Sequence, residues 1–471
     1  MLRAGSGSGG SGVVNGLGST RFINSQIPVV LLGDSITAQH VAGSASQISA
    51  SSTTRGYVNW VNFKLGNPFY FPMGYDGNLP YDTGSISGTG RPVGHNAGIG
   101  SDKLPGMISR LQTDVIALNP AICFFHAGTN DLQGGDTAAN IKANFATIID
   151  RLLAASIHPV VTGILARNAT DGAGVDFDAT KRLRRCDINR YVKAYCMAKG
   201  ATYIDPDIAF CNPATGDANT GYTGEGLHPN SVGAEYIADT VLAAITRLNI
   251  GRPYRDLINN VYDVYDATEN PFGNLLPNAD LSGTAGTAGT NVTGSVADTW
   301  TAEMTSGSAT STVVASKSTV SIYGNSIVTQ KFVVTHDGLG LSSETLRFKH
   351  TTPATITTAA ANGTWVQGSS YLKLSAPTGT KNVISAMFLL EDQSDGRFSR
   401  NGLYRDTGVY MIGAAREGLI NGVPKQLKGT TGLKWNYQFV FDNTISGTTT
   451  IEVALPMYQV CPVTPPWTYY V

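Results

Sequence analysis

The stretch Val29-Val30-Leu31-Leu32-Gly33-Asp34-Ser35-Ile36-Thr37 decides the fold class of this chain. Its four leading apolar residues predict a buried strand, and Gly-Asp-Ser predicts the turn that ends it. Such a strand would place Ser35 at the carboxyl edge of a sheet, where ligands bind in open α/β sheets. The simpler interpretation is that Asp34 and Ser35 only cap the next helix. The choice between a ligand-site residue and a helix cap depends on whether the chain also provides the groups that a nucleophilic serine needs.

Strands and helices alternate on either side of this turn. Further strands are expected where short apolar runs occur, at 121–126, 159–165 and 202–205, and residues 93–100 are expected to be a short strand that leads into a glycine-rich turn. Helices are expected where apolar residues recur every three to four positions, at 55–65, 102–118, 137–155, 179–199 and 231–248. This order predicts a parallel sheet with helices on both faces. We therefore assign residues 20–250 to one α/β domain.

Two segments interrupt this pattern. Residues 40–52 are small and polar, and they predict a helix start followed by a loop. Residues 66–92 form a long loop rich in Gly, Pro and aromatic residues. Its aromatic side chains could line a sugar or acyl site, or the loop could pack on itself, and the sequence favours neither interpretation.

The character of the chain changes after about Phe272. Helical periodicity disappears, and short alternating runs separated by Ser, Thr and Gly take over. Such runs predict a β-sandwich over residues 272–471, with the low-complexity segment 282–295 as a loop. Residues 251–271 are expected to be a connector. Residues 1–19 are expected to be a flexible Gly/Ser-rich segment, without the apolar core of a signal peptide.

Composition narrows the choice of partners. The formal net charge is -1, which favours neither nucleic acid nor an anionic membrane. Charged residues make up only 14% of the chain, so its surface must be rich in hydroxyl and amide groups. No apolar run approaches the roughly 20 residues of a membrane span. The five cysteines have no zinc-ligand spacing, so neither a disulfide framework nor a metal site is predicted (Cys123, Cys186, Cys196, Cys211, Cys461).

A nucleophilic serine needs a base and a carboxylate that orients the base. The candidate base is His228, which follows a Gly-rich loop just before the last helix of the α/β domain. The candidate orienting group is Glu225, three residues earlier, because one turn of chain could bring its carboxylate to the imidazole. The alternatives are a histidine that only flanks a helix and a solvated loop glutamate.

An acyl-transfer site also needs hydrogen-bond donors for the developing oxyanion. Gly98 and Asn130 each follow a predicted strand, and with the Ser35 N–H they would make a three-donor oxyanion hole. Each such donor typically contributes roughly 3 kcal/mol to transition-state stabilisation. The alternative for each is ordinary turn chemistry. His95 and His126 either flank this pocket or pack at strand ends.

Four short blocks carry a family resemblance: Gly33-Asp34-Ser35, the Gly98 turn, Gly128-Thr129-Asn130-Asp131 and His228. In this order they resemble the blocks of the SGNH hydrolases, also called GDSL esterases. The resemblance implies a flavodoxin-like three-layer α/β/α fold over residues 20–250 and acyl transfer without metal or organic cofactor. Ser35 would be the nucleophile and His228 the base. Ser35, Gly98 and Asn130 would form the oxyanion hole.

This chain departs from the family pattern in two places. One is the long insertion between Ser35 and Gly98, which could build a lid or a substrate wall. The other is the residue three positions before the histidine. The family usually has Asp three residues before its histidine, where this chain has Glu225, whose extra methylene changes reach but not charge. Ser35 does not lie in a G-x-S-x-G elbow, which disfavours the α/β-hydrolase fold.

An esterase domain followed by a β-sandwich resembles carbohydrate O-acetylesterases and bacteriophage tail esterases. There the sandwich is a jelly-roll, carbohydrate-binding-like module, and 274–278 resembles its opening strand. The resemblance implies removal of O-acetyl groups from a polysaccharide, in an extracellular or virion-tail location. It also suggests a homo-oligomer, trimeric in a tail protein. The alternatives are a lipase or arylesterase for hydrophobic acyl esters, and a glycan-binding adhesin with a residual esterase domain.

Overall fold

The computed structural model describes a set of segments that covers most of both predicted domains. They are residues 27–44, 47–53, 55–65, 69–70, 96–168, 177–245, 248, 263–271, 273–306, 308–322, 324–341, 343–351, 364–375, 383–392, 397–404, 415–421, 425–426 and 433–460. The expected flexible segment 1–19, most of the aromatic loop 66–92, His95 and Cys461 lie outside the described residues.

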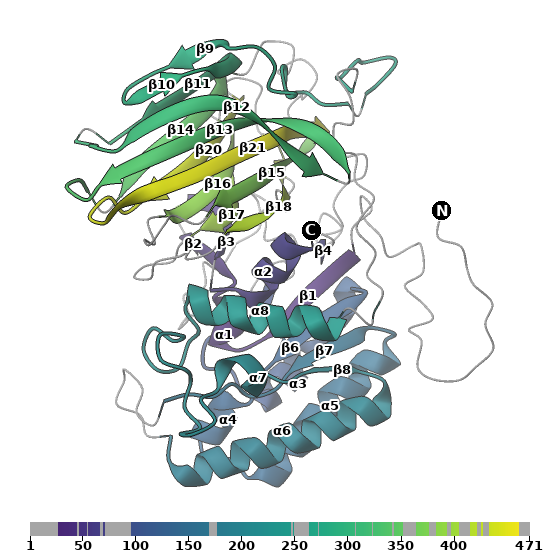
Figure 1. Cartoon of the computed structure of the whole chain (residues 1–471). Helices are drawn as coiled ribbons and strands as arrows, with labels where there is room; N and C mark the ends of the chain where they lie inside the picture. Colours follow the sequence, from purple (N-terminus) through teal and green to yellow (C-terminus); the bar gives the residue numbers. More distant parts are fainter. Residues whose placement is uncertain are drawn as a thin grey trace.

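A parallel sheet forms the centre of the N-terminal domain (Figure 1). Its strand order is β4-β1-β6-β7-β8, and β5 also pairs with β1. Every one of these pairings is parallel, as the alternating sequence predicted. The strands are β1 (Ile27–Gly33), β4 (Phe69–Tyr70), β5 (Asn96–Gly98), β6 (Ile122–His126), β7 (His158–Thr162) and β8 (Thr202–Ile204).

Helices cover both faces of this sheet. They are α1 (Ser35–Ala38), α2 (Tyr57–Lys64), α3 (Leu104–Asp114), α4 (Thr129–Gln133), α5 (Ala138–Ala154), α6 (Ala179–Lys199), α7 (Asp207–Phe210) and α8 (Ser231–Ile245). Successive β1 side chains face opposite sides, as the two-residue period of a strand requires. Val29 and Leu31 pack with α2 and α8, whereas Val30 and Leu32 pack with α3, α5 and α6. The predicted three-layer α/β/α fold is therefore confirmed.

The long helix α6 shows how local sequence sets its limits. The Asp178 carboxylate accepts a hydrogen bond from the Lys181 N–H at the N-terminus. Gly200 follows the last helical residue with φ +76°, a conformation that glycine adopts without steric cost. The predicted bounds 179–199 are confirmed.

The C-terminal domain is a β-sandwich, as predicted. One sheet has the order β10-β12-β13-β21-β15-β18 with β19 beside β15, and the other has β2-β3-β17-β16-β20-β14-β11-β9. Phe332 and Phe348 come from opposite sheets and meet edge to face, with ring centroids 5.1 Å apart. The strands are β9 (Ala285–Ala288), β10 (Val292–Gly294), β11 (Val296–Met304), β12 (Thr312–Ile322), β13 (Asn325–Asp337), β14 (Glu344–Thr351), β15 (Trp365–Ser375), β16 (Val383–Asp392), β17 (Arg397–Tyr404), β18 (Arg416–Asn421), β19 (Lys425–Gln426), β20 (Leu433–Phe441) and β21 (Ser446–Val460).

Two expectations about the start of the sandwich are wrong. Segment 282–295 is not a loop, because β9 and β10 lie within it and pair with β11 and β12. Segment 274–278 is not an opening strand. Its Asn274 makes only an isolated bridge to Val264, and its side chain holds the chain against β21 by donating to the Pro456 carbonyl at 3.1 Å. Sheet neighbours far along the chain, rather than local composition, decide both outcomes.

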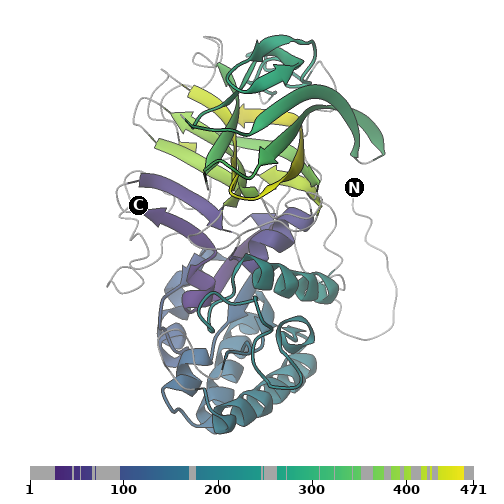
Figure 2. The same cartoon turned by 60° about the vertical axis from the view of Figure 1, so that its left-hand side comes forward.

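The predicted loop at 40–52 is also wrong, and the difference joins the two domains. After the single turn of α1, the chain forms strands β2 (Val41–Ser44) and β3 (Gln47–Thr53). Strand β3 pairs in parallel with β17, with Ser51 opposite Arg400 and Thr53 opposite Tyr404. Figure 2 shows these two purple strands beside the strands of the sandwich. The α/β domain therefore supplies one edge of a sandwich sheet, a few residues after Ser35.

Helix α2 forms a second connection between the domains. It packs against both α8 and β18. The apolar core on this face of the parallel sheet continues without interruption into the sandwich core. Lys64 at the end of α2 forms ion pairs with Glu235 and Asp239 of α8, which fix the two helices side by side.

Two further properties follow from the described residues. Each helix among them is too short or too polar to cross a membrane. Within the same segments, Cys123, Cys186, Cys196 and Cys211 carry free thiols.

Three buried histidines are expected to make stability fall in mild acid. Burial lowers the pKa of His40, His158 and His336 to about 4, against 6.5 for a free imidazole. Between these values the unfolded chain binds protons that the folded chain does not, so stability is fully present above about pH 6.5 and falls as the pH drops toward 4. Burial raises the pKa of Asp131 to about 6, which offsets part of this loss.

Urea unfolding at pH 7 and pH 4.5 measures this effect. His158→Gln removes one of the three imidazoles, so this variant is expected to lose less stability between the two pH values than the wild type. Equal losses in both proteins would contradict the assignment for His158.

Candidate active site

Ser35 lies where strand β1 meets helix α1. It is the first residue of α1 and is 8% exposed. The fully buried Asp34 precedes it, and its Oδ1 accepts from the Ile36 N–H at 2.9 Å, which caps the helix. The N–H of a first helical residue has no acceptor within its own helix. Asp34 therefore supplies the helix cap, and the Ser35 hydroxyl is left for other contacts at this turn.

The loop before α8 brings His228 to this serine. His228 Nε2 lies 2.8 Å from Ser35 Oγ, within hydrogen-bond distance. Gly226 turns the loop with φ +89°, and the Gly224 N–H donates to the His228 carbonyl at 3.2 Å. Asn230 then caps α8 by accepting from the Val232 and Gly233 N–H groups at 3.0 Å.

Glu225 lies on the other side of the same imidazole. Its Oε1 contacts His228 Nδ1 and also accepts from the His228 backbone N–H at 3.0 Å. Partial burial alone would raise the pKa of the Glu225 carboxyl. The hydrogen bonds and charge of His228, helped by the charge of Arg55, outweigh burial and hold this pKa below its usual value. The extra methylene of glutamate thus does not prevent contact with the ring.

The three candidate oxyanion donors belong to three different elements, Ser35 to α1, Gly98 to β5 and Asn130 to α4. Register places Gly98 of β5 opposite Gly33 of β1. The Gly98 N–H donates to Asn96 Oδ1 at 3.0 Å, and the Asn130 side-chain amide donates to the Asp102 carbonyl at 3.0 Å. A bound oxyanion would therefore have to share or displace the Asn96 oxygen, while Asn130 keeps a second amide hydrogen.

His126 does not line this site. It is fully buried at the end of β6, with Nδ1 3.6 Å from Asp34 Oδ1, so it packs behind the nucleophile turn. Asp131 is likewise buried, and both its oxygens accept from the Leu104 N–H at the start of α3. His126 thus packs against the turn after β1, and Asp131 holds the start of α3, so both are buried structural residues.

The arrangement has the elements of nucleophilic catalysis. A hydroxyl, an imidazole and a carboxylate form one hydrogen-bonded series, which can remove a proton from the hydroxyl as it attacks. Among the described residues no group of three or more His, Cys, Asp and Glu side chains is arranged to hold a metal ion.

Sequence reasoning missed Arg110, which contacts the backbone beside two of these segments. Its guanidinium donates to the Ala97 carbonyl at 2.7 Å and to the Gly33 carbonyl at 3.1 Å. A signal was present, because Arg110 lies beside Met107 and Leu111 on the apolar stripe of a predicted helix, where a charged residue needs a buried partner.

Residues 31–236 match the profile of the GDSL-like lipase/acylhydrolase family. These residues span the α/β domain from β1 to α8 and include Ser35, Gly98, Asn130 and His228. The α/β domain is a GDSL-like lipase/acylhydrolase domain. The resemblance to SGNH hydrolases is confirmed for this part of the chain, and the family match does not extend to the sandwich. No curated protein matches the chain.

Solved structures similar to the GDSL-like domain include two bacterial enzymes. One is a GDSL-like lipase from Bacteroides thetaiotaomicron, 20% identical, which covers 49% of this chain and 90% of its own, with a TM-score of 0.35. The other is a catalytic mutant of an acetylxylan esterase from Geobacillus stearothermophilus, 17% identical, which covers 47% of this chain and 95% of its own, with a TM-score of 0.33.

A methyl group added at Gly98 is expected to disturb this site. A Cβ there would lie 2.2 Å from the Ala38 N and 2.6 Å from the Thr37 carbonyl carbon, both backbone atoms of α1 or its end. Because α1 carries Ser35, Gly98→Ala is expected to lower kcat by on the order of 10²-fold through misplacement of the hydroxyl. Ester hydrolysis assays measure this loss. Wild-type kcat in Gly98→Ala would contradict the tight packing at this position.

Proposed function

We propose that the protein is a serine esterase that removes O-acetyl groups from a polysaccharide through an acyl-serine intermediate. The observation that carries the proposal is the 2.8 Å contact between Ser35 Oγ and His228 Nε2, in a domain of the GDSL-like lipase/acylhydrolase family. Ester hydrolysis follows from the family and this geometry together. The carbohydrate substrate is the further step.

In the proposed mechanism His228 acts first as a base. Its Nε2 takes the Ser35 proton while Oγ attacks the ester carbonyl carbon, and Glu225 stabilises the resulting imidazolium. The Ser35 and Gly98 N–H groups and the Asn130 amide would donate to the oxyanion. The intermediate collapses as His228 protonates the leaving alcohol. Water then attacks the acyl-serine by the same route, which releases acetate and restores Ser35.

The sandwich supports a carbohydrate substrate. Strand β3 and helix α2, both close to Ser35 in the sequence, pack against sandwich strands, so the second domain lies beside the hydrolase domain (Figure 1). A chain with 14% charged residues and 54 glycines offers mainly neutral polar groups, which suit hydroxyl-rich ligands better than ionic ones. A location outside the cell or in a virion tail, and a homo-oligomeric assembly, belong to the same proposal.

A series of esters tests the acyl preference. p-Nitrophenyl acetate, butyrate and octanoate should be compared with acetate release from an O-acetylated polysaccharide, with Ser35→Ala as the control. We expect the acetyl ester to be cleaved fastest and polysaccharide acetate to be released only by active protein. Preference for the octanoyl ester would instead support a lipase. Equal release by wild type and Ser35→Ala would support an adhesin without esterase activity.

The variant Glu225→Gln tests whether the negative charge of Glu225 is needed, in addition to its contact with the His228 ring. Glutamine keeps the shape of the side chain but cannot stabilise an imidazolium, so kcat is expected to fall by roughly 10- to 10⁴-fold. Glu225→Asp is the matched variant, because it keeps the charge and shortens the reach. Wild-type kcat in Glu225→Gln would reassign the orienting group.

A further inference from the structure

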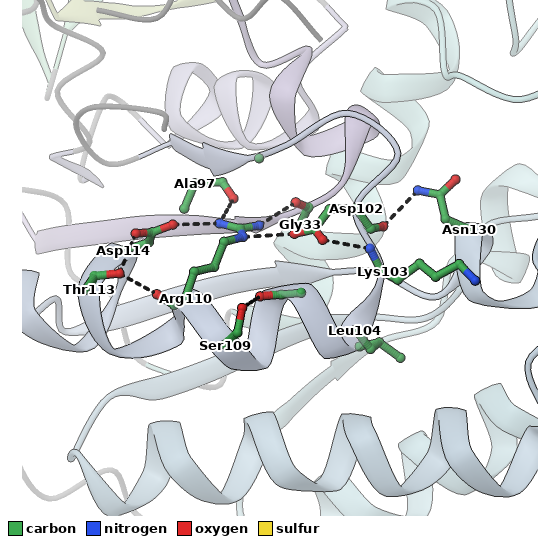
Figure 3. Close-up of polar contacts among 12 residues, drawn as sticks. Gly33, Ala97, Asp102, Lys103, Leu104, Ser109, Arg110, Thr113, Asp114 and Asn130 are labelled. Carbon is green, nitrogen blue, oxygen red and sulfur yellow. Dashed lines mark hydrogen bonds and ion pairs between the residues drawn. The ribbon is translucent and has the colours of Figure 1, made fainter. Parts of the chain in front are cut away.

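The buried side chain of Arg110 connects the segments that carry the candidate oxyanion donors. Arg110 lies in α3 and is 8% exposed. Its Nη2 donates to the Gly33 carbonyl at 3.1 Å, its Nη1 to the Ala97 carbonyl at 2.7 Å, and its Nε to Asp102 Oδ2 at 2.9 Å. Figure 3 shows these contacts converging on one guanidinium.

Each contact lies next to a group of the proposed site. Gly33 immediately precedes Asp34 and the nucleophile Ser35. Asp102 holds Asn130 through its backbone carbonyl, which accepts from the Asn130 amide at 3.0 Å. Arg110 lies outside the four family blocks. It contacts the Gly33-Asp34-Ser35 block directly, and it contacts Asn130 through Asp102.

The contact with Ala97 bears most directly on catalysis. The Ala97 carbonyl and the Gly98 N–H belong to the same planar peptide group and point in opposite directions. When Arg110 fixes that carbonyl, it also fixes the direction of the Gly98 N–H. A cationic donor on the carbonyl oxygen further polarises the peptide, which makes its N–H a stronger donor.

The charges around Arg110 support a fixed position. Arg110 forms ion pairs with Asp102 and Asp114, whose side chains are 14% and 7% exposed. The planar guanidinium has several N–H donors in fixed directions, so it can bond two carbonyls and two carboxylates at the same time. The ammonium group of a lysine cannot make these four hydrogen bonds together.

We infer that Arg110 is the positioning residue of the oxyanion hole, which it aligns through the Ala97–Gly98 peptide, the Gly33 carbonyl and Asp102. This inference rests on the proposed esterase function. Arg110 does not touch the substrate; it acts through the groups that do.

Arg110→Met and Arg110→Lys test the inference, with Arg151→Met as the matched control. Arg151 also donates to a backbone carbonyl of α3, that of Ile108 at 2.8 Å, and within the described segments it forms no hydrogen bond to Gly33, Ala97 or Asp102. The measurements are kcat and KM for p-nitrophenyl acetate, the inhibition constant of phenylboronic acid, and the thermal unfolding midpoint. Phenylboronic acid probes the oxyanion hole because its tetrahedral serine adduct places an oxygen there.

We expect both Arg110 variants to lose kcat, by about 10²-fold in Arg110→Met, with little change in KM. Inhibition by phenylboronic acid should weaken by a similar factor. Arg151→Met should lower the unfolding midpoint but leave kcat and inhibition unchanged. Wild-type kcat and inhibition in folded Arg110→Met would overturn the inference.

Chemical rescue gives a measurement that does not depend on comparing proteins of different stability. Added methylguanidinium is expected to raise kcat of Arg110→Ala at least tenfold and to have no effect on Ser35→Ala. Absence of rescue, with kcat falling only in proportion to the folded fraction, would assign Arg110 a purely structural role. If the wild type neither hydrolyses an ester nor binds phenylboronic acid, the proposed function itself fails. If the wild type does both and the Arg110 variants behave like Arg151→Met, only the inference about Arg110 fails.

Discussion

Ser35→Ala is expected to lower kcat for p-nitrophenyl acetate by on the order of 10⁴- to 10⁶-fold. The hydroxyl is the group that forms the acyl intermediate, and nothing else at the turn between β1 and α1 can replace it. The remaining rate would come from substrate binding and the oxyanion donors acting on water. Steady-state assays, with active sites titrated by a fluorophosphonate in the wild type, measure the loss.

Stability should change little in Ser35→Ala. The variant loses one hydrogen bond to His228, which typically contributes about 1 kcal/mol, and Asp34 still caps α1. Ser370→Ala is the matched control, since Ser370 is a buried serine of the sandwich that donates to the Ala454 carbonyl at 2.9 Å. It should lose stability and keep kcat. Equal activity of Ser35→Ala and wild type would remove Ser35 from the mechanism.

His228→Ala should show a loss of similar size. Without the imidazole the Ser35 proton has no acceptor, because no other base contacts Ser35 Oγ among the described residues. We therefore expect kcat to fall by on the order of 10⁴- to 10⁶-fold, and Ser35→Ala/His228→Ala to be no more than about tenfold slower than either single variant. Such non-additivity is the signature of two groups that act as one unit.

The control for His228 is His158→Ala. His158 lies at the start of β7, at the opposite end of the sheet from the nucleophile turn, and its Nε2 contacts Thr202 Oγ1 at 2.9 Å. This variant should change stability and leave kcat unchanged. Fully additive losses in the Ser35/His228 double variant would mean that the two side chains act independently.

Much of the hydrolase fold was predictable because its signals are local. Helix α6 shows an apolar period, an Asp178 cap and a Gly200 stop within one short stretch, so its bounds needed no knowledge of the rest of the chain. The predictions for 282–295 and 40–52 failed because these segments lack such a period. They become strands only when β11, β12 or β17 offers hydrogen-bonding partners.

The candidate site also contains residues that the sequence could predict and one that it could not. Ser35, Gly98, Asn130 and His228 could be selected because each stands in a short block after a predicted strand or before a predicted helix. Arg110 could not be selected by that rule, since it lies inside a helix. Its importance comes from carbonyls that other strands present to it.

The sequence by itself determined the alternation of strands and helices in the α/β domain from β6 to α8 and the residues that follow β1 and β6. The burial of one face of a helix or of alternate residues of a strand imposes a period that is visible over a few residues. Only the tertiary structure decided that Glu225 reaches the His228 ring, that Arg110 joins β1 to β5, and that β3 completes a sandwich sheet. Arg110 and β3 contact other elements of the chain, and the Glu225 contact depends on the turn of its loop at Gly226, so no local period records any of them.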